Sequence, residues 1–315
     1  MYRKAVIFGI KSTKLSADEK SFLIKHKPWG IILFSRNIKN IKQLKFLIND
    51  IKKIFRDNNY PIIIDQEGGR VSRLNKIMDF GLFSQEYFGT LYKNDKNHFF
   101  KVYKIYIDTV CYILKNIGVN INTVPVLDVR KKNSHNIIGD RSFSSDPTIV
   151  GKMGNLCVDL YNKNKIATVI KHIPGHGGTK SDSHFFTPVV NDSKKKLIKH
   201  DFKPFKICQS FFAMTAHVIY KSYDKKYVCT HSKIIIDEVI RKLINFKGII
   251  ISDDISMGAL KFNLKTNVIR ALDVGCNLIL HCNGNIKEMS KLAKIIPTIN
   301  KFTQKKTEQF YKFLG

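Results

Sequence analysis

Eight short, mainly apolar runs recur along the chain and alternate with longer amphipathic segments that carry many lysines. The runs cover residues 5–10, 30–34, 61–64, 119–127, 167–170, 212–216, 248–251 and 277–280. Apolar runs with little polar alternation are typical of parallel strands that are buried on both faces of a sheet. The pattern therefore predicts eight buried parallel strands.

The segments between these runs carry helix signals. Ser16 followed by Glu19 is a capping-box pattern, which predicts a helix that ends before Gly30. Apolar residues recur at helical spacing over 37–55 and 286–296, and the last fifteen residues are expected to form a terminal helix. Eight strand-then-helix units favour a (β/α)8 TIM-type barrel over an open doubly wound sheet. We expect one barrel domain over residues 1–315, since barrels often exceed 250 residues.

Polar residues follow seven of the eight predicted strands, at the barrel end where active sites of this fold lie. Any one of these residues could cap a helix, but ionisable groups after so many strands predict a polar pocket. The groups are Ser35-Arg36-Asn37, the segment 65–70 (DQEGGR), Asp128, Lys171-His172, His217, Ser252-Asp253-Asp254 and His281.

Two chemistries fit acids and histidines around a barrel mouth. Metal-assisted hydrolysis would use His172, His176, His184 and His217 with a carboxylate, but the first strand lacks the histidine pair usual in such barrels. Glycosyl transfer needs a carboxylate to attack the anomeric carbon and a second group to move the proton. Asp253 and Asp254 supply the carboxylate, and no metal or cofactor is then needed; nucleotide-binding glycine motifs are also absent.

The segment 171–184 (KHIPGHGGTKSDSH) is the candidate for the proton-transfer group. Its three glycines give the backbone unusual freedom. It ends in Asp182-Ser183-His184, a spacing at which a carboxylate can orient the imidazole two residues further on and raise its basicity. The alternative is that Asp182 and His184 cap the next helix.

The chain resembles the bacterial β-N-acetylglucosaminidases of glycoside hydrolase family 3 that act in peptidoglycan recycling. The resemblance rests on motifs over nearly the whole chain, and most specifically on the KHxPGHG…DSH segment. The motifs are GIILFSRN (30–37), DQEGGRVSR (65–73), VPVLDV (124–129), GDRSFSSDP (139–147), 171–184, MTAHV (214–218), GIIISDDISM (248–257) and GCNLILHCNG (275–284).

The resemblance implies a role for individual residues. Asp253 matches the nucleophile, His184 the general acid/base, and Asp182 the carboxylate that partners it. Binding of the terminal sugar falls on Asp65, Arg73, Arg141, Lys171 and His172. The implied activity is removal of β-linked N-acetylglucosamine from muropeptides with retention of configuration. Another family 3 glycosidase remains an alternative. A glycoside phosphorylase is also an alternative, because a neutral histidine base does not repel an anionic acceptor such as phosphate.

The charge balance is the unusual feature of the composition. Lysine and arginine number 54 against 25 acids, a formal net charge of +29, and only nine of the bases are arginine. A basic nucleic-acid-binding barrel without enzymatic activity is the alternative from another functional class. The lysines are scattered rather than clustered, however, and four arginines fall within the family motifs. We therefore expect no nucleic-acid partner.

The remaining expectations concern the environment of the protein. Hydrophobic residues make up 43% of the chain, which excludes a disordered class. Six irregularly spaced cysteines predict reduced thiols. No signal-peptide core, and no apolar stretch near the ~20 residues of a spanning helix, is recognisable. We expect a cytoplasmic monomer that acts on a small carbohydrate and has no membrane partner.

Overall fold

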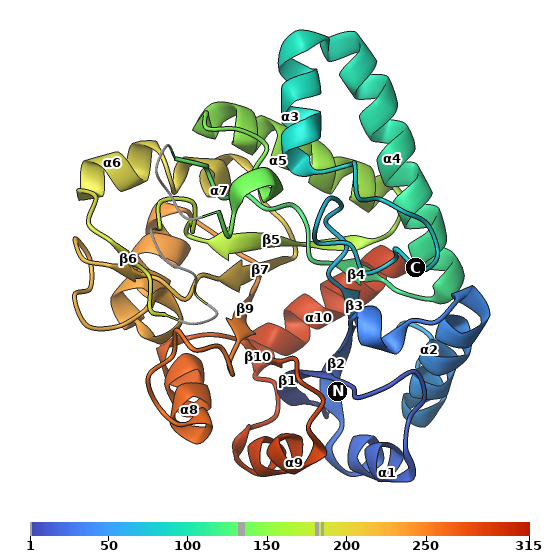
Figure 1. Cartoon of the computed structure of the whole chain (residues 1–315). Coiled ribbons are helices and arrows are strands. Elements are labelled where there is room, and N and C mark those ends of the chain that lie inside the picture. Colours follow the sequence, from blue (N-terminus) through green and yellow to red (C-terminus); the bar gives the residue numbers. More distant parts are fainter. Residues whose placement is uncertain (1, 132–135, 180–182, 184–185) are drawn as a thin grey trace.

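A closed barrel of eight parallel strands forms the centre of the molecule (Figure 1). The computed structural model describes residues 2–131, 136–179, 183 and 186–315. Around the barrel the strand order is β1-β10-β9-β7-β5-β4-β3-β2. Each of the eight predicted runs overlaps one of these strands, so the predicted TIM-type barrel is confirmed. The barrel strands are β1 (Lys4–Gly9), β2 (Pro28–Leu33), β3 (Ile62–Ile64), β4 (Ile121–Asn122), β5 (Ala167–Ile173), β7 (Phe212–Thr215), β9 (Ile249–Asp254) and β10 (Leu278–His281).

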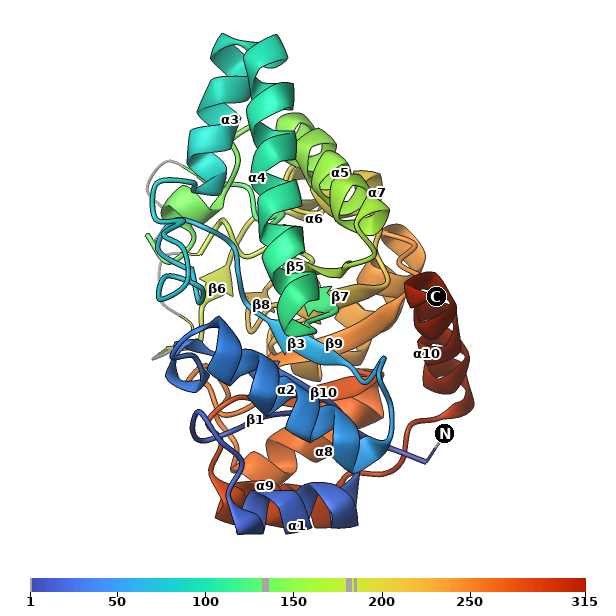
Figure 2. The same cartoon turned by 90° about the vertical axis from the view of Figure 1, so that its right-hand side faces the viewer.

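Helices follow the strands and surround the barrel (Figures 1 and 2). The α-helices are α1 (Ala17–His26), α2 (Ile41–Phe55), α3 (Gln85–Asn94), α4 (Lys96–Ile117), α5 (Pro147–Lys163), α6 (Lys194–Lys199), α7 (Lys203–Ile207), α8 (Leu264–Val274), α9 (Ile286–Ile295) and α10 (Lys301–Leu314). Short or irregular helical segments are η1 (Ser35–Asn37), η2 (Gly139–Arg141), η3 (Cys229–His231) and η4 (Ile235–Leu243). Among the helices in the described part of the chain, none is both long and apolar enough to cross a membrane.

The strands are apolar on both faces because both faces are covered. Every residue of β2, β3, β5, β7 and β10 is buried. Isoleucines lie side by side across neighbouring strands, as in the Ile31–Ile62 and Ile32–Ile63 pairs of β2 and β3. One face of these strands fills the barrel interior and the other contacts the helices, which explains the lack of polar alternation in the sequence.

Three boundaries test the sequence predictions closely. The capping box is confirmed, since Ser16 Oγ accepts from Glu19 N at 3.1 Å and Glu19 Oε2 accepts from Ser16 N at 2.9 Å. The helix expected from residue 37 begins at Ile41, because Asn40 caps it and residues 35–37 form the separate turn η1. The strand expected over 119–127 is reduced to β4, since Pro125 lacks the N–H that a central strand must donate.

Helix α10 covers the end of the barrel at which the strands begin (Figure 2). The ring of Phe310 lies against Phe212 and Trp29, with ring centroids 5.5 and 6.4 Å apart. The indole of Trp29 also donates to Thr307 Oγ1 at 2.9 Å. The strand starts are therefore closed by the C-terminal helix, and the opposite end is available for a site.

Two features lie outside the predicted pattern. Helices α3 and α4 form a hairpin that projects away from the barrel (Figures 1 and 2). A small parallel sheet pairs β6 (Val189–Val190) with β8 (Ile219–Tyr220), which belong to the connections after β5 and β7. This second sheet joins two of the loops that follow the barrel strands.

Candidate active site

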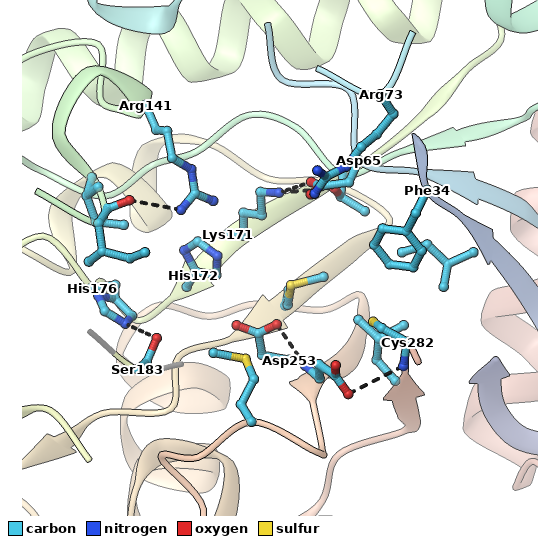
Figure 3. A pocket seen from close by; sticks show the side chains of 18 residues that line it. Phe34, Asp65, Arg73, Arg141, Lys171, His172, His176, Ser183, Asp253 and Cys282 are labelled. Carbon is cyan, nitrogen blue, oxygen red and sulfur yellow. Dashed lines mark hydrogen bonds and ion pairs between the residues drawn. The ribbon is translucent and has the colours of Figure 1, made fainter. Parts of the chain in front are cut away.

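A cavity of about 180 Å³ opens at the carboxyl ends of the barrel strands (Figure 3). We call it the barrel-mouth cavity. It is smaller than the roughly 300–1,000 Å³ of pockets for drug-sized ligands, and its size suits a single sugar ring. The structure brings together around it the residues predicted to bind sugar and the predicted nucleophile: Asp65, Arg73, Arg141, Lys171, His172 and Asp253. The other two predicted catalytic residues, Asp182 and His184, lie outside the described residues.

Asp65 follows β3 and is the centre of a cluster of charges. Lys171 Nζ contacts its Oδ1 at 2.5 Å, Arg73 Nη2 contacts its Oδ2 at 2.6 Å, and the hydroxyl of Thr123 donates to Oδ1 at 2.6 Å. Burial alone would raise the pKa of Asp65, but the charges of Lys171 and Arg73 outweigh burial and hold this pKa far below its usual range. Asp65 is therefore an ionised acceptor at the cavity wall.

Glu67 lies behind this wall and was predicted within the polar segment 65–70 without an assigned role. Its side chain is 1% exposed and makes a two-point ion pair with Arg141, with both N–O distances at 2.8 Å. Lys171 Nζ contacts its Oε1 at 2.5 Å. Burial would raise the pKa of Glu67, and Arg141 and Lys171 lower it overall. Glu67 thus fixes two cations of the cavity without lining it.

Asp128, after β4, organises two histidines: His172 near the end of β5 and His176 in the connection that follows β5. Its Oδ2 lies 2.7 Å from His172 Nδ1, and its Oδ1 accepts from the backbone N–H of His176 at 2.6 Å. The ring of His176 lies 3.1 Å from Ser183 Oγ through Nε2 and 3.1 Å from Thr179 Oγ1 through Nδ1. Burial and the neighbouring His172 lower the pKa of His176 to about 4, so this imidazole is neutral near pH 7.

The two aspartates at the end of β9 have different surroundings. Asp253 is half-buried and faces the cavity, and its Oδ1 accepts from Asp254 N at 2.8 Å. Burial would raise the pKa of Asp253, but His172 and His217 outweigh it and lower the pKa. Asp254 instead caps the turn that follows the strand, with its Oδ1 accepting from the backbone and hydroxyl of Ser256 at 3.1 and 2.8 Å.

Several strand-end residues do not reach the cavity. Asn37 is fully buried and donates to the carbonyls of Ile10 and Ser12. His217 is buried between Thr230 and the carbonyl of Asp254. The ring of His281 points to Glu288, with 3.1 Å between Nε2 and Oε2. These three side chains join the ends of strands and loops to one another, a structural role that strand position alone does not distinguish from catalysis.

The cavity also has an apolar side that sequence analysis missed. The ring of Phe34 contacts two guanidinium groups, with Arg36 at 4.7 Å and Arg73 at 5.5 Å from its ring centroid. Arg36 itself donates to the carbonyls of Ile10 and Cys282. The apolar and sulfur-bearing lining residues are Ile32, Phe34, Ile137, Ile138, Met214, Met257, Leu280 and Cys282. Apolar residues at strand ends carry no sequence signal that separates cavity lining from core.

We predict that Gly177→Ala destabilises the protein by roughly 1–3 kcal/mol, as overpacking of a rigid site does. A Cβ atom at Gly177 would lie 1.9 Å from the carbonyl oxygen of Val129, which is backbone. The matched control is Gly178→Ala, whose Cβ would meet the end of the flexible Lys131 side chain at 2.6 Å. Urea unfolding measures both variants, and equal losses would contradict a specific contact at Gly177.

The metal alternative has a limited donor set in the structure. Within the described ranges, no three His, Cys, Asp or Glu side chains are placed to hold a metal ion. His172 and His217, two histidines of that alternative, instead bond to Asp128 and Thr230 through Nδ1. The described residues of the cavity are thus arranged as hydrogen-bond donors and acceptors, and the carboxylate of Asp253 faces the space between them.

Comparison with known proteins identifies the family. The model of the glycosyl hydrolase family 3 N-terminal domain matches residues 4–310. The chain belongs to glycoside hydrolase family 3. The predicted resemblance and the predicted enzyme class, a glycoside hydrolase, are thereby confirmed. Family membership contradicts the alternative of a nucleic-acid-binding barrel without enzymatic activity.

Relatives match this family 3 hydrolase over most of its length. It is 33% identical over 295 residues to the β-hexosaminidase of Hydrogenovibrio crunogenus, covering 92% of this chain and 82% of the relative. It is 31% identical over 306 residues to the β-hexosaminidase of Psychromonas ingrahamii, covering 94% and 88%. The structure of native NagZ from Neisseria gonorrhoeae matches with a TM-score of 0.88 and 28% identity, over 100% of this chain and 90% of that one. The complex of that NagZ with N-trifluoroacetyl-D-glucosamine matches with a TM-score of 0.86 and the same identity, over 98% and 90%.

Proposed function

We propose that this family 3 hydrolase is a retaining β-N-acetylglucosaminidase that removes terminal N-acetylglucosamine from the non-reducing end of its substrate. The observation that carries the proposal is the carboxylate of Asp253, which has a lowered pKa and faces a cavity sized for one sugar ring. An ionised carboxylate beside the anomeric carbon is the nucleophile of retaining glycosidases. The β-hexosaminidase relatives support N-acetylhexosamine as the sugar.

The polar side of the cavity would hold the hydroxyl groups of the sugar. Asp65 accepts hydrogen bonds from them, and Arg73, Arg141, Lys171 and His172 surround the same space. The Nε atom of Arg73 is buried without a partner among the described residues, which leaves a donor for a ligand. A site built on such contacts discriminates strongly against sugars that lack the matching group.

The reaction proceeds in two displacements. Asp253 attacks the anomeric carbon, forming a C1–O bond as the glycosidic C1–O bond breaks, and His184 gives its proton to the leaving oxygen. Neutral His184 then takes a proton from water, whose oxygen displaces Asp253 from C1 with net retention of the β configuration. Asp182 orients His184. The dyad is supported by the DSH motif and by Ser183, the residue between its two members, which lines the cavity.

The substrate we propose is a muropeptide of the type N-acetylglucosaminyl-1,6-anhydro-N-acetylmuramic acid, with or without its peptide. A cavity for one sugar ring fits removal of a terminal residue rather than cleavage inside a polymer. The enzyme would then act in cell-wall recycling, as a single-domain cytoplasmic monomer. The net charge of +29 adds at most a general attraction for the anionic stem peptide.

Offering this disaccharide to the enzyme with and without phosphate tests the function. We expect free N-acetylglucosamine in both reactions, appearing first as the β anomer in a proton NMR time course. N-acetylglucosamine 1-phosphate as the main product would instead identify a phosphorylase. Faster cleavage of an aryl β-glucoside than of the matching aryl N-acetyl-β-glucosaminide would identify the other family 3 alternative, and an α anomer appearing first would contradict retention.

A further inference from the structure

Asp128 is a buried carboxylate for which the proposed reaction has no role. Its side chain is fully buried, and it does not line the barrel-mouth cavity. Among the described residues, the hydrogen bonds of its carboxylate are all with two histidines: His172 Nδ1 at 2.7 Å, His172 N at 3.3 Å and His176 N at 2.6 Å. Burying an ionised group is costly unless it is paired. Because this carboxylate is buried in contact with histidines of the site, we look for its role in what it does to those histidines.

We propose that Asp128 is a positioning residue that holds His172 as the Nδ1–H form, so that Nε2 of His172 faces the reacting sugar beside Asp253. The carboxylate and imidazole make a second acid–histidine pair, separate from Asp182 and His184. The proposal about His172 and Asp128 rests on geometry. Its kinetic consequence for Asp253 rests on the proposed function.

The contact geometry fixes which ring nitrogen carries the proton. A carboxylate is only an acceptor, so the 2.7 Å contact requires a hydrogen on Nδ1 of His172. The neutral ring then has its lone pair on Nε2, and the charged ring has a hydrogen on both nitrogens. Figure 3 places the His172 ring between Lys171 and Asp253, inside the cavity. Asp128 thereby determines what His172 presents to a ligand.

The pair also acts on the charge of the nucleophile. Of the charged groups around Asp253, His172 has the largest influence in lowering its pKa, ahead of His217 and Lys171. A carboxylate stabilises positive charge on the imidazole it touches, and that charge favours the ionised form of Asp253. Among the described residues, the other titratable groups that face His172, Asp253 or both are His176, His217, Lys171, Asp254 and Cys282.

Asp128→Asn is a sharp test because the surroundings fix how the amide must lie. Oδ1 accepts from the backbone N–H of His176, so the amide oxygen must keep that place. The amide NH2 is then left facing Nδ1 of His172, where only an unprotonated nitrogen can accept it. The substitution should therefore move the proton of His172 from Nδ1 to Nε2 with little change in volume.

The direct measurement is the protonation of His172 and does not depend on activity. Long-range ¹H–¹⁵N correlation spectra of ¹⁵N-histidine-labelled protein, assigned with His172→Gln, report which ring nitrogen carries hydrogen. We expect Nδ1–H in the parent protein and Nε2–H in Asp128→Asn. Nδ1 without hydrogen in the parent protein, or an unchanged His172 spectrum in the variant, would overturn the proposal whatever the enzyme cleaves.

The kinetic measurement uses an aryl N-acetyl-β-glucosaminide with a nitrophenolate leaving group, which departs with little protonation. The acidic limb of kcat/KM then follows ionisation of Asp253 in the free enzyme. For Asp128→Asn we expect this limb to move to higher pH by roughly half a unit to one unit. The value of kcat/KM on the pH-independent plateau above the limb should fall roughly 10- to 100-fold. In a His172→Gln background the same substitution should leave the limb in place.

The control is Asp57→Asn, which removes a carboxylate paired with Arg3 and Tyr311 at the opposite end of the barrel. It should lower stability without moving the limb. If Asp128→Asn lowers the plateau with no movement of the limb, Asp128 supports only the fold. A limb that moves to lower pH would also contradict the proposal, since it would mean direct repulsion between Asp128 and Asp253. Absence of cleavage by the parent protein would instead refute the proposed function. The spectra of His172 would then be the remaining test of the role of Asp128.

Discussion

Replacing Asp253 by alanine should abolish cleavage of an aryl N-acetyl-β-glucosaminide, with kcat lowered roughly 10⁴- to 10⁶-fold, as for other deleted nucleophiles. The reason is that Asp253 is the carboxylate that faces the cavity with a lowered pKa while its neighbour is engaged in capping a turn. A stopped or continuous assay of phenolate release measures the decrease in kcat. Mass spectrometry of the protein with a slowly hydrolysed fluorosugar should detect a covalent adduct on the peptide that contains Asp253.

Asp254 provides the matched control because it adjoins Asp253 in the chain and lines the same cavity. Asp254→Ala removes the acceptor for Ser256, so it should reduce stability and retain more activity than Asp253→Ala. Asp254→Asn keeps an acceptor oxygen and should recover part of that loss. An active Asp253→Ala together with an inactive Asp254→Ala would make Asp254 the nucleophile and refute our assignment.

The strand pattern was sufficient to predict the barrel, because burial on both faces removes polar residues from whole strands. β2 and β7, for example, have no exposed residue, and their limits agree with the predicted runs to within two residues. Helix starts were less predictable. The apolar spacing over 37–55 continues through a turn, and only the contacts of Asn37 and Asn40 separate η1 from α2. Local hydrogen bonds decide such boundaries, and periodicity does not record them.

The site was predictable where a residue's position along a strand also determines its direction. Asp65, Lys171 and Asp253 lie at or near the carboxyl ends of strands and line the cavity at the barrel mouth, and the family motifs include them. Glu67 and Asp128 were predicted among the polar strand-end groups but received no individual role, because their function depends on partners distant in sequence: Arg141 is 74 residues from Glu67, and His172 is 44 residues from Asp128. A sequence without a structure cannot reveal which buried cation or imidazole a carboxylate will meet.

Asp65→Asn should lower kcat/KM roughly 100- to 1,000-fold, the second largest effect we expect. The substitution removes a charged acceptor for the sugar and places an amide NH2 or an uncharged oxygen against Arg73 and Lys171. It leaves the buried ammonium of Lys171 and the partly buried guanidinium of Arg73 with less compensation, so the free energy of unfolding at pH 7 should fall by roughly 3 kcal/mol. Phenolate release and urea unfolding measure the two losses.

The difference in stability between the parent protein and Asp65→Asn should also depend on pH in a defined direction. The pKa of Asp65 is lower in the folded protein than in the unfolded chain, where it is about 4. Its contribution to stability is therefore complete above pH ~4 and is lost as the pH falls toward the folded pKa, because only the unfolded chain takes up a proton there. The variant lacks this proton uptake. The difference in free energy of unfolding between the parent protein and the variant should therefore decrease by at most about 1.4 kcal/mol per pH unit below pH 4.

Asp57→Asn is the control for Asp65→Asn. It shows which losses of activity and stability follow from replacing any partly buried aspartate. Asp57 pairs with Arg3 and Tyr311, far from the cavity, so its replacement should reduce stability while kcat/KM stays within about twofold. Unfolding at pH 7, 5, 4 and 3 compares the three proteins. A gap between the parent protein and Asp65→Asn that stays constant or widens below pH 4 would mean that Lys171 and Arg73 do not hold Asp65 ionised. In that case the charge cluster could not be what prepares the cavity for a sugar.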